Sequence, residues 1–419
     1  MPWLSLQSAF GLAAIVCLAW IFSERRRAFS LRQVVVGIAL QIILALAMLK
    51  LAFAREALLA LNSVVDVLTE ATRAGTGFVF GYMGGGAAPF EVTQPANAFV
   101  LGFQALPLVL VMSALSALLW HWRILDWVTR GFAWALQKSM GLGGAVGLAS
   151  AANVFVGMVE APLLIRPYLE RLTRSELFIM MTVGLASVSG TVLVLYASVL
   201  APVVEGALGQ ILVASLISLP AGIVVARLMV PEDEGIQGTD VMKGEALTQY
   251  ESSMDAITRG TVDGLHLWLN IIAMLLVVVA LVALANTIVG AFPDLGGAPL
   301  TLQRMLGWVF SPLVWLMGVP ASEMQTAGQL MGTKTILNEF IAYINLSQLP
   351  EGALSPRSSL IMIYGMCGFA NLGSVGILIG GLTALVPSRR ADIVTLGTRS
   401  IVSGTLATCM TGAVIGIIT

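Results

Sequence analysis

Long apolar runs, separated by short charged or glycine-rich segments, occupy most of this chain. A helix rises about 1.5 Å per residue, so about 20 apolar residues can cross a hydrocarbon layer about 30 Å thick. The runs of this length, predicted to be transmembrane helices, are Pro2–Phe22, Gln33–Phe53, Ala98–Trp120, Ser175–Leu200, Val203–Val230, Leu265–Ile288, Ser358–Leu385 and Ile393–Ile418.

Two further apolar stretches, residues 141–169 and 318–346, are interrupted by small and polar residues. The first begins and ends beside basic residues, so both of its ends lie on one side, which predicts a re-entrant helical hairpin. Its motif NVFVGMVEAP places Glu160 between a glycine that can end a helix and a proline that can start one. The second stretch predicts a matching hairpin that contains Glu339.

The two halves of the chain repeat one order of elements. Each hairpin follows a Trp-rich amphipathic stretch, residues 124–138 or 302–316, typical of a helix in the membrane interface, and precedes two spans. The motif GLASVSG at Gly184–Gly190, where we expect a helix to unwind, resembles GFANLGS at Gly368–Ser374. Because one unit starts inside and the other outside, the repeat is inverted, as in many secondary transporters. This predicts an all-α polytopic membrane protein with eight transmembrane helices and two re-entrant hairpins.

The composition agrees with a membrane protein. Of the 419 residues, 58% are hydrophobic and only 11% are charged, whereas soluble domains carry about 25% charged residues. The net charge is −1 and no basic patch is interleaved with aromatic residues, so we expect no nucleic-acid partner. The three cysteines lie in apolar segments without CxxC spacing, which indicates packing rather than a disulfide or metal site.

The basic residues indicate the topology. The first run precedes its arginines, so it is predicted to stay as a transmembrane helix rather than to be a cleaved signal. Basic residues favour the cytoplasmic side, so we expect a multi-pass protein of the cell inner membrane with both termini outside, in the periplasm. Those predicted inside are Arg25, Arg26, Arg27, Arg32, Arg123, Arg130, Lys138, Arg166, Arg171, Arg174, Arg227, Lys243, Arg259, Arg389 and Arg390, against Lys50, Arg55, Arg73, Arg304 and Arg357 outside.

A charged segment, residues 231–264, is predicted to be a cytoplasmic linker between the halves. The expected division is 1–120, N-terminal scaffold helices; 121–230, first repeat; 231–300, linker and scaffold span; 301–419, second repeat.

Several polar side chains fall inside the predicted hairpins and the spans after them. Charged groups at this depth are costly and are usually retained for function. Together they suit a polar, uncharged solute with several hydroxyls and a small cation. The alternative is structural: the amides and hydroxyls join helices, and Lys334 forms a salt bridge with Glu339. The residues are Asn153, Glu160, Ser187 and Ser189 in the first half, and Lys334, Asn338, Glu339, Asn371 and Ser374 in the second.

The chain contains no GxSxG, HExxH or phosphate-loop motif, so we expect a transporter rather than an enzyme. A receptor that only senses a solute is the other open alternative.

At these motifs the sequence resembles the concentrative nucleoside transporter family. The resemblance runs from about Phe99 to the C-terminus, through FQALPLVL, AANVFVGMVEAPLLIRPYL, GTKTILNEFIAY, CGFANLGSVGI and GGLTALVPSRR. It implies a cation-coupled nucleoside importer that forms a homotrimer. The first three spans and the sixth would form a fixed scaffold, while both hairpins and spans four, five, seven and eight would move like an elevator.

The resemblance also implies site residues. For the ribose these are Glu339, Asn371 and Ser374, with Phe369 close by; for the base they are Met158, Val159, Glu160 and Val192. For sodium they are the side chains of Asn153 and Ser187 and the carbonyls of Val156 and Val188. Apart from the resemblance, Lys334 and Asn338 are predicted supporting residues of the site, because they are polar groups in the second hairpin.

Two departures from the family make the base side of the site match it less well than the ribose side. Met158-Val159 stands where the family commonly has Gln-Thr, and the family's Gly-Ala-Glu-Ser run is Gly144–Gly147 here, Gly-Ala-Val-Gly. Because Asn153 and Ser187 are retained, sodium is the favoured coupling ion and no other cofactor is expected; proton coupling through Glu160 or Glu339 is the alternative.

Overall fold

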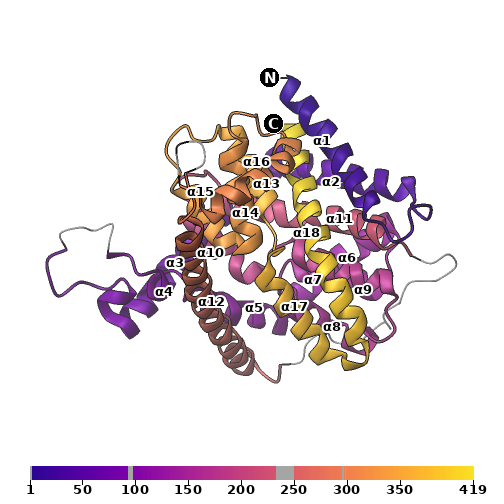
Figure 1. Ribbon diagram of the computed structural model, residues 1–419. Helices are drawn as coiled ribbons and strands as arrows, with labels where there is room; N and C mark the ends of the chain where they lie inside the picture. Colours follow the sequence, from indigo (N-terminus) through magenta and orange to yellow (C-terminus); the bar gives the residue numbers. More distant parts are fainter. Residues whose placement is uncertain (1, 93–97, 233–249, 295–296, 298) are drawn as a thin grey trace.

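The computed structural model describes residues 2–92, 98–232, 250–294, 297 and 299–419, and every regular element in this part of the chain is helical (Figure 1). The two chain ends lie at the same end of the molecule (Figure 1), as expected for an even number of crossings. Most of the predicted linker, residues 233–249, falls outside the described residues.

The first half contains the expected first five spans and first hairpin. Its helices are α1 (Pro2–Ile21), α2 (Leu31–Lys50), α3 (Ala52–Phe80), η1 (Gly81–Gly84), α4 (Leu101–Gln104), α5 (Leu108–His121), α6 (Ile124–Met140), α7 (Gly144–Asn153), α8 (Glu160–Leu164), η3 (Arg166–Tyr168), α9 (Arg174–Ala186), α10 (Gly190–Leu200) and α11 (Ala207–Met229). The fourth span unwinds between α9 and α10, within GLASVSG as predicted.

The second half repeats this order. Its helices are α12 (Ser253–Val289), α13 (Leu302–Met317), α14 (Met324–Ile336), α15 (Glu339–Ser347), α16 (Pro356–Met366), α17 (Leu372–Leu385), η4 (Pro387–Arg389) and α18 (Arg390–Ile418). The helix α12 begins well before the predicted Leu265, because Ser252 caps it by accepting a hydrogen bond from the amide of Asp255.

The predicted span Ser358–Leu385 contains a break that was not predicted. The segment consists of α16 and α17 with a break between them. By length and composition, the described residues contain seven candidate membrane spans, among them the interrupted segment Arg174–Leu200 but not α16–α17, whose two helices are each too short. The new helix α17 starts at a polar cap, because the side chain of Asn371 accepts from the amide of Ser374 at 2.7 Å. This second break corresponds to the break between α9 and α10 in the first half.

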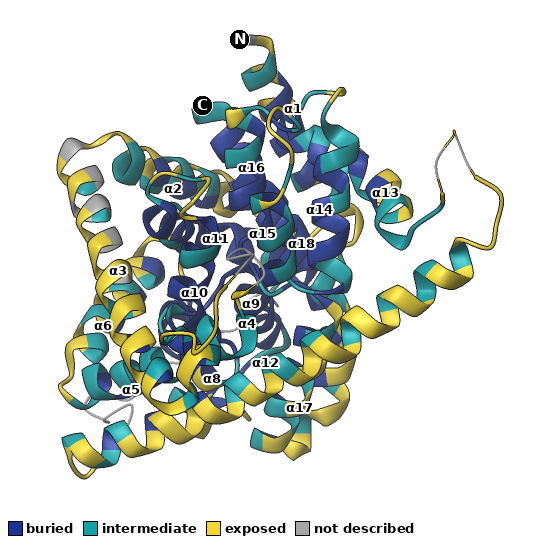
Figure 2. Ribbon diagram, turned by 90° about the vertical axis from the view of Figure 1, so that its left-hand side faces the viewer, coloured by how far each residue is buried: buried dark blue, intermediate teal, exposed yellow. Residues whose placement is uncertain are grey.

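The buried centre is formed by α9, α11 and α18, which pack on one another. The helix α1 packs on α18 and α13, and α2 packs on α11. By contrast, α12 packs mainly on α5 and is exposed along much of its length (Figure 2), and many of its exposed side chains are apolar. The membrane-spanning segments therefore group into an inner core and an outer α5–α12 pair.

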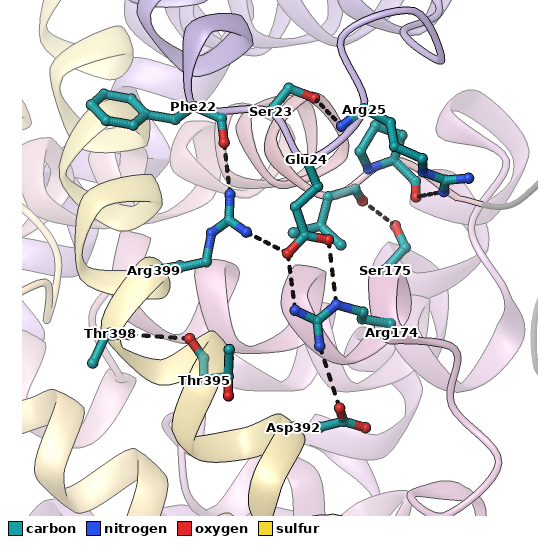
Figure 3. Close-up of polar contacts among 12 residues, drawn as sticks. Phe22, Ser23, Glu24, Arg25, Arg174, Ser175, Asp392, Thr395, Thr398 and Arg399 are labelled. Atoms are coloured by element: carbon teal, nitrogen blue, oxygen red, sulfur yellow. Dashed lines mark hydrogen bonds and ion pairs between the residues drawn. The ribbon is translucent and has the colours of Figure 1, made fainter.

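The connection between α1 and α2 is tied to the core by ionic contacts (Figure 3). Glu24 forms ion pairs with Arg174 at the start of α9, at 2.9 Å, and with Arg399 on α18. Arg174 also contacts Asp392 at 3.3 Å, and the Glu24 amide donates to the Met229 carbonyl at the end of α11 at 2.9 Å. The contacts join the α1–α2 connection to three core helices.

Replacing Glu24 should loosen this connection. The hydrogen bond from Arg174 lowers the pKa of the Glu24 carboxyl, so its stabilising effect is present above its ordinary pKa and is lost as the pH falls through the lowered value. Because the pairs are partly solvated, we expect Glu24→Gln to cost about 1 kcal/mol at neutral pH. Thermal unfolding in detergent should show a lower midpoint for the variant at pH 7, a difference that persists down to the ordinary glutamate pKa of about 4.3 and disappears only below it. Equal midpoints at pH 7 would contradict this role.

Candidate functional site

The two helix breaks meet in the core. The amide of Phe369, in the second break, donates to the carbonyl of Ser187, in the first, at 3.4 Å. Gly368 permits this approach, because a Cβ at its position would lie 2.8 Å from the carbonyl oxygen of Ala186. The non-helical backbone of both repeats is thus gathered at one place, which membranes tolerate only inside protein or beside a cavity.

Glu339 begins the second arm of the second hairpin and points into this region. It is the first residue of α15, where the helix dipole favours a negative charge, and Asn338 caps that helix by accepting from the Ile341 amide at 2.9 Å. Tyr196 donates to one oxygen of the Glu339 carboxylate at 2.6 Å, and Asn371 donates to the other at 3.1 Å. Glu339 is therefore held by neutral donors from two other segments, α10 and the second break.

Asn371 links the second break to Glu339. Its side-chain oxygen accepts from the Ser374 amide, which turns its NH₂ group toward the carboxylate. Of the residues predicted to hold a ribose, Glu339, Asn371 and Ser374 are therefore joined in one chain of contacts, and the half-buried Phe369 lies two residues from Asn371.

Tyr196 was not predicted from the sequence. It lies in an aliphatic stretch of α10, and its ring stacks on Phe340 at 5.8 Å and contacts Tyr343 at 5.6 Å. The one signal in the sequence that could have identified it was a tyrosine inside an apolar span, because a buried phenol hydroxyl needs a hydrogen-bond partner.

Asn153 and Ser187 form a second polar centre. The Asn153 amide donates to the Ser187 hydroxyl at 2.6 Å, while its oxygen Oδ1 is buried and has no hydrogen-bond partner among the described residues. The carbonyl of Val156 lies in the turn after α7, and the carbonyl of Val188 lies in the first break, where it accepts from Ser215 at 3.0 Å. A buried oxygen without a donor, in a region where backbone carbonyls lie outside regular helix, is a fitting environment for a small hard cation.

The tip of the first hairpin packs against the first break, α9 and α17. Gly157, at φ 115°, makes its turn, and a Cβ there would lie 2.8 Å from an oxygen of Glu160 and 3.3 Å from the Cβ of Ser189. Met158 lies against Gly184 of α9 and Val159 against Gly381 of α17. Glu160 starts α8 and is exposed, unlike Glu339, which is 3% exposed. Val192 is buried on α10, one turn before Tyr196.

Lys334 is fully buried on α14, and its Nζ has no hydrogen-bond partner within the described part of the chain. The salt bridge with Glu339 that the structural interpretation required is therefore not formed. Asn338, the other predicted supporting residue, acts as the cap of α15.

Comparisons with known proteins cover almost the whole chain. A family profile described as "Na+ dependent nucleoside transporter N-terminus" matches residues 10–83, one described as "Nucleoside recognition" matches 102–203, and one described as "Na+ dependent nucleoside transporter C-terminus" matches 210–416.

Individual relatives also match almost the whole of this chain. The chain is 35% identical over 419 residues to the nucleoside permease NupC of Helicobacter pylori, covering 99% of this chain and 97% of that one. It is 33% identical over 430 residues to human solute carrier family 28 member 3, covering 99% of this chain and 60% of the human one.

Solved structures are also similar. CNTnw in an inward-facing substrate-bound state matches with a TM-score of 0.89 and 35% identity over 99% of this chain and 98% of that one. A doubly substituted CNTnw in an outward-facing state matches with a TM-score of 0.90 and 35% identity over 100% and 98%.

Proposed function

Because this chain belongs to the Na⁺-dependent, or concentrative, nucleoside transporter family, we propose that it imports nucleosides across the inner membrane together with sodium. The observation that carries this proposal is that the two helix breaks meet, with Glu339 of the second hairpin bonded to Asn371 in the second break and Asn153 of the first hairpin bonded to Ser187 in the first break. Members of the family are transporters, and the site offers binding groups rather than a nucleophile.

The ribose is recognised by Glu339, Asn371 and Ser374, with Phe369 beside them. A carboxylate has about four acceptor sites, and Tyr196 and Asn371 use one on each oxygen. The remaining sites can accept from two adjacent hydroxyls, which is the arrangement that the 2′ and 3′ positions of a ribose present. Such charge-assisted hydrogen bonds are about twice as strong as neutral ones.

The base faces Met158, Val159, Glu160 and Val192. Met158 and Val159 offer no side-chain hydrogen bonds to a base edge, so apolar contact and Glu160 provide recognition there. We expect the ribose to contribute more to selectivity than the base, since a site that hydrogen-bonds a substrate hydroxyl strongly rejects an analogue without it.

Sodium is held by the oxygens of Asn153 and Ser187 and by the carbonyls of Val156 and Val188. The buried Oδ1 of Asn153 supports this assignment, because an acceptor without a donor is costly unless a cation or water satisfies it. The cation would also lie in the first break, so its binding would order the backbone that contacts Phe369 and the second break.

The moving body comprises the two hairpins with α9–α11 and α16–α18, and α5 with α12 belongs to the scaffold. The exposed apolar face of α12 supports a homotrimer, because contiguous exposed apolar surface marks contacts with lipid or with another copy. The Glu24 contacts and the packing of α1 on α18 favour moving α1 and α2 with the core rather than with the scaffold to which the resemblance assigns them. The distribution of basic residues along the chain supports a topology in which both termini lie outside.

Competition of labelled uridine uptake tests the substrate assignment. Cells that carry the protein would be supplied with uridine and an excess of adenosine, guanosine, inosine or 2′,3′-dideoxyuridine, with and without sodium. The ribonucleosides should compete in sodium and the dideoxy analogue should not. Equal competition by the dideoxy analogue would contradict ribose recognition by Glu339.

A further inference from the structure

An apolar groove lies between α2, α6 and α11, and none of the residues that line it belongs to the sites described above. Its volume is about 430 Å³, within the range of about 300–1,000 Å³ that is usual for small-molecule sites. The helix α2 packs on both α6 and α11, and each of the three helices forms one wall. The lining includes Leu40, Leu44 and Met48 of α2, Phe132 of α6, and Leu216 and Leu219 of α11.

The direction of the groove suits a lipid chain. Its α2 wall is a stripe of residues spaced four apart, from Leu40 to Met48, so the groove follows this helix for roughly 12 Å. Both α2 and α11 are candidate membrane spans, which places the groove along the direction of the acyl chains of a bilayer. It opens at the molecular surface, because Trp134 on its α6 wall is 62% exposed. An apolar groove in this position excludes water and is filled by hydrocarbon.

One end of the groove is positively charged. Lys138, in the last turn of α6, is the one charged side chain among the described residues that line it. Its ammonium lies 5.0 Å from the ring centre of Trp134, and no carboxylate in the described part of the chain forms an ion pair with it. A tryptophan beside a lysine on an amphipathic helix is typical of the level of lipid headgroups.

A small polar hollow adjoins this end of the groove. It is lined by Ser30 and Gln33 at the start of α2, by Met140, two residues after Lys138 on α6, and by Arg227 near the end of α11. The guanidinium of Arg227 donates to the carbonyls of Met140 and of the next residue, which fixes the end of α6 against α11. The hollow holds about 10 Å³, room for one oxygen-sized group, and none of the described residues that line it is acidic.

We propose that this groove binds an anionic phospholipid, with one acyl chain along the α2 stripe and the phosphate of the headgroup at Lys138 and the polar hollow. Lipid tails are as apolar as leucine, so the chain alone gives little preference over bulk lipid, and the headgroup contact provides the selectivity. Because no carboxylate lines this end of the groove in the described part of the chain, the ammonium of a zwitterionic headgroup finds no partner there.

A lipid fits this groove better than a second copy of the chain. The helix α12, whose exposed face supports a homotrimer, lies on the left of Figure 1, whereas α2 and α11 lie on the right of the core helix α18. The groove is therefore separate from the surface that we assign to contacts between subunits, and it faces the bilayer.

Native mass spectrometry of the full-length purified protein measures this binding. Phosphatidylglycerol and phosphatidylcholine with identical chains would be added separately, with thermal unfolding as a check on folding. Lys138→Gln removes the charge at the groove, and Lys50→Gln makes the same change at the opposite end of α2 as its control. Leu44→Trp fills the groove, and Ile43→Trp, at a neighbouring position that is 60% exposed and does not line the groove, is the control for added bulk.

Wild type and both controls should bind phosphatidylglycerol about fivefold or more tightly than phosphatidylcholine. Lys138→Gln should lower the affinity for phosphatidylglycerol about fivefold, the effect expected of one basic residue at a membrane surface, and leave phosphatidylcholine unchanged. Leu44→Trp should lower the binding of both lipids. Equal affinity of the wild type for the two lipids, or unchanged binding of phosphatidylglycerol by Lys138→Gln, would overturn the proposal. A Leu44→Trp protein that dissociates into monomers but keeps its lipid would assign the groove to a second copy and also overturn it.

Discussion

Glu339→Gln is expected to lower nucleoside uptake about 100-fold or more. The amide replaces one acceptor oxygen by an NH₂ donor, which would face the donating hydroxyl of Tyr196 or the donating NH₂ of Asn371. It also removes the charge that strengthens bonds to the ribose hydroxyls. Hydrogen bonds to charged groups contribute about 1.5–3 kcal/mol each, so the loss of two corresponds to about 3 kcal/mol or more, or over 100-fold in affinity.

Uptake of labelled uridine into vesicles that contain equal amounts of each protein checks this prediction. Glu351→Gln is the control, since it makes the same chemical change at an exposed position after the second hairpin. Wild type and Glu351→Gln should transport at similar rates. Uptake by Glu339→Gln within about twofold of wild type would remove this carboxylate from the site.

Asn153→Leu is expected to abolish the stimulation of uptake by sodium. Leucine has a similar size and shape but lacks the buried oxygen Oδ1, so the proposed cation site would lose a ligand and the Ser187 hydroxyl would lose its donor. We expect the apparent affinity for sodium to fall at least about tenfold, the effect of losing roughly 1.4 kcal/mol of ligand interaction.

The control is Ser150→Ala, which removes a buried hydroxyl one turn earlier on the same helix; this hydroxyl too has no partner among the described residues. Initial uptake rates would be measured over a range of sodium concentrations at fixed membrane potential. The control should keep the sodium dependence of the wild type. The same sodium dependence in Asn153→Leu would exclude Asn153 from the cation site.

Much of this fold follows from local sequence. The apolar runs predict spans, and Gly157 predicts the interruption of the first hairpin before Glu160, with Pro162 in the first turn of the helix that follows. The break between α9 and α10 was predictable from its small residues. The equivalent break between α16 and α17 was missed, although GFANLGS resembles GLASVSG, because Asn371 becomes a helix cap only when Glu339 and the first break pack against it.

The site residues that are polar groups in apolar segments could be predicted from the sequence, and those whose role depends on tertiary contacts could not. Glu339, Asn371, Asn153 and Ser187 are polar residues in apolar surroundings, so a search for intramembrane polar groups finds them. Tyr196 was not found in this way, because its role depends on its hydrogen bond to Glu339, which lies 143 residues away in the sequence. The separation of Lys334 from Glu339 is likewise a tertiary property, which the sequence presented only as a possible salt bridge.

The central claim is sodium-driven nucleoside import, and reconstituted vesicles test it directly. Purified protein would be placed in vesicles with no nucleoside inside, and labelled uridine would be followed after imposing either an inward sodium gradient or an inward proton gradient. The account predicts accumulation above the external concentration with sodium alone, and none with the proton gradient in the absence of sodium. Accumulation that ignores sodium and collapses when the proton gradient is dissipated would contradict it.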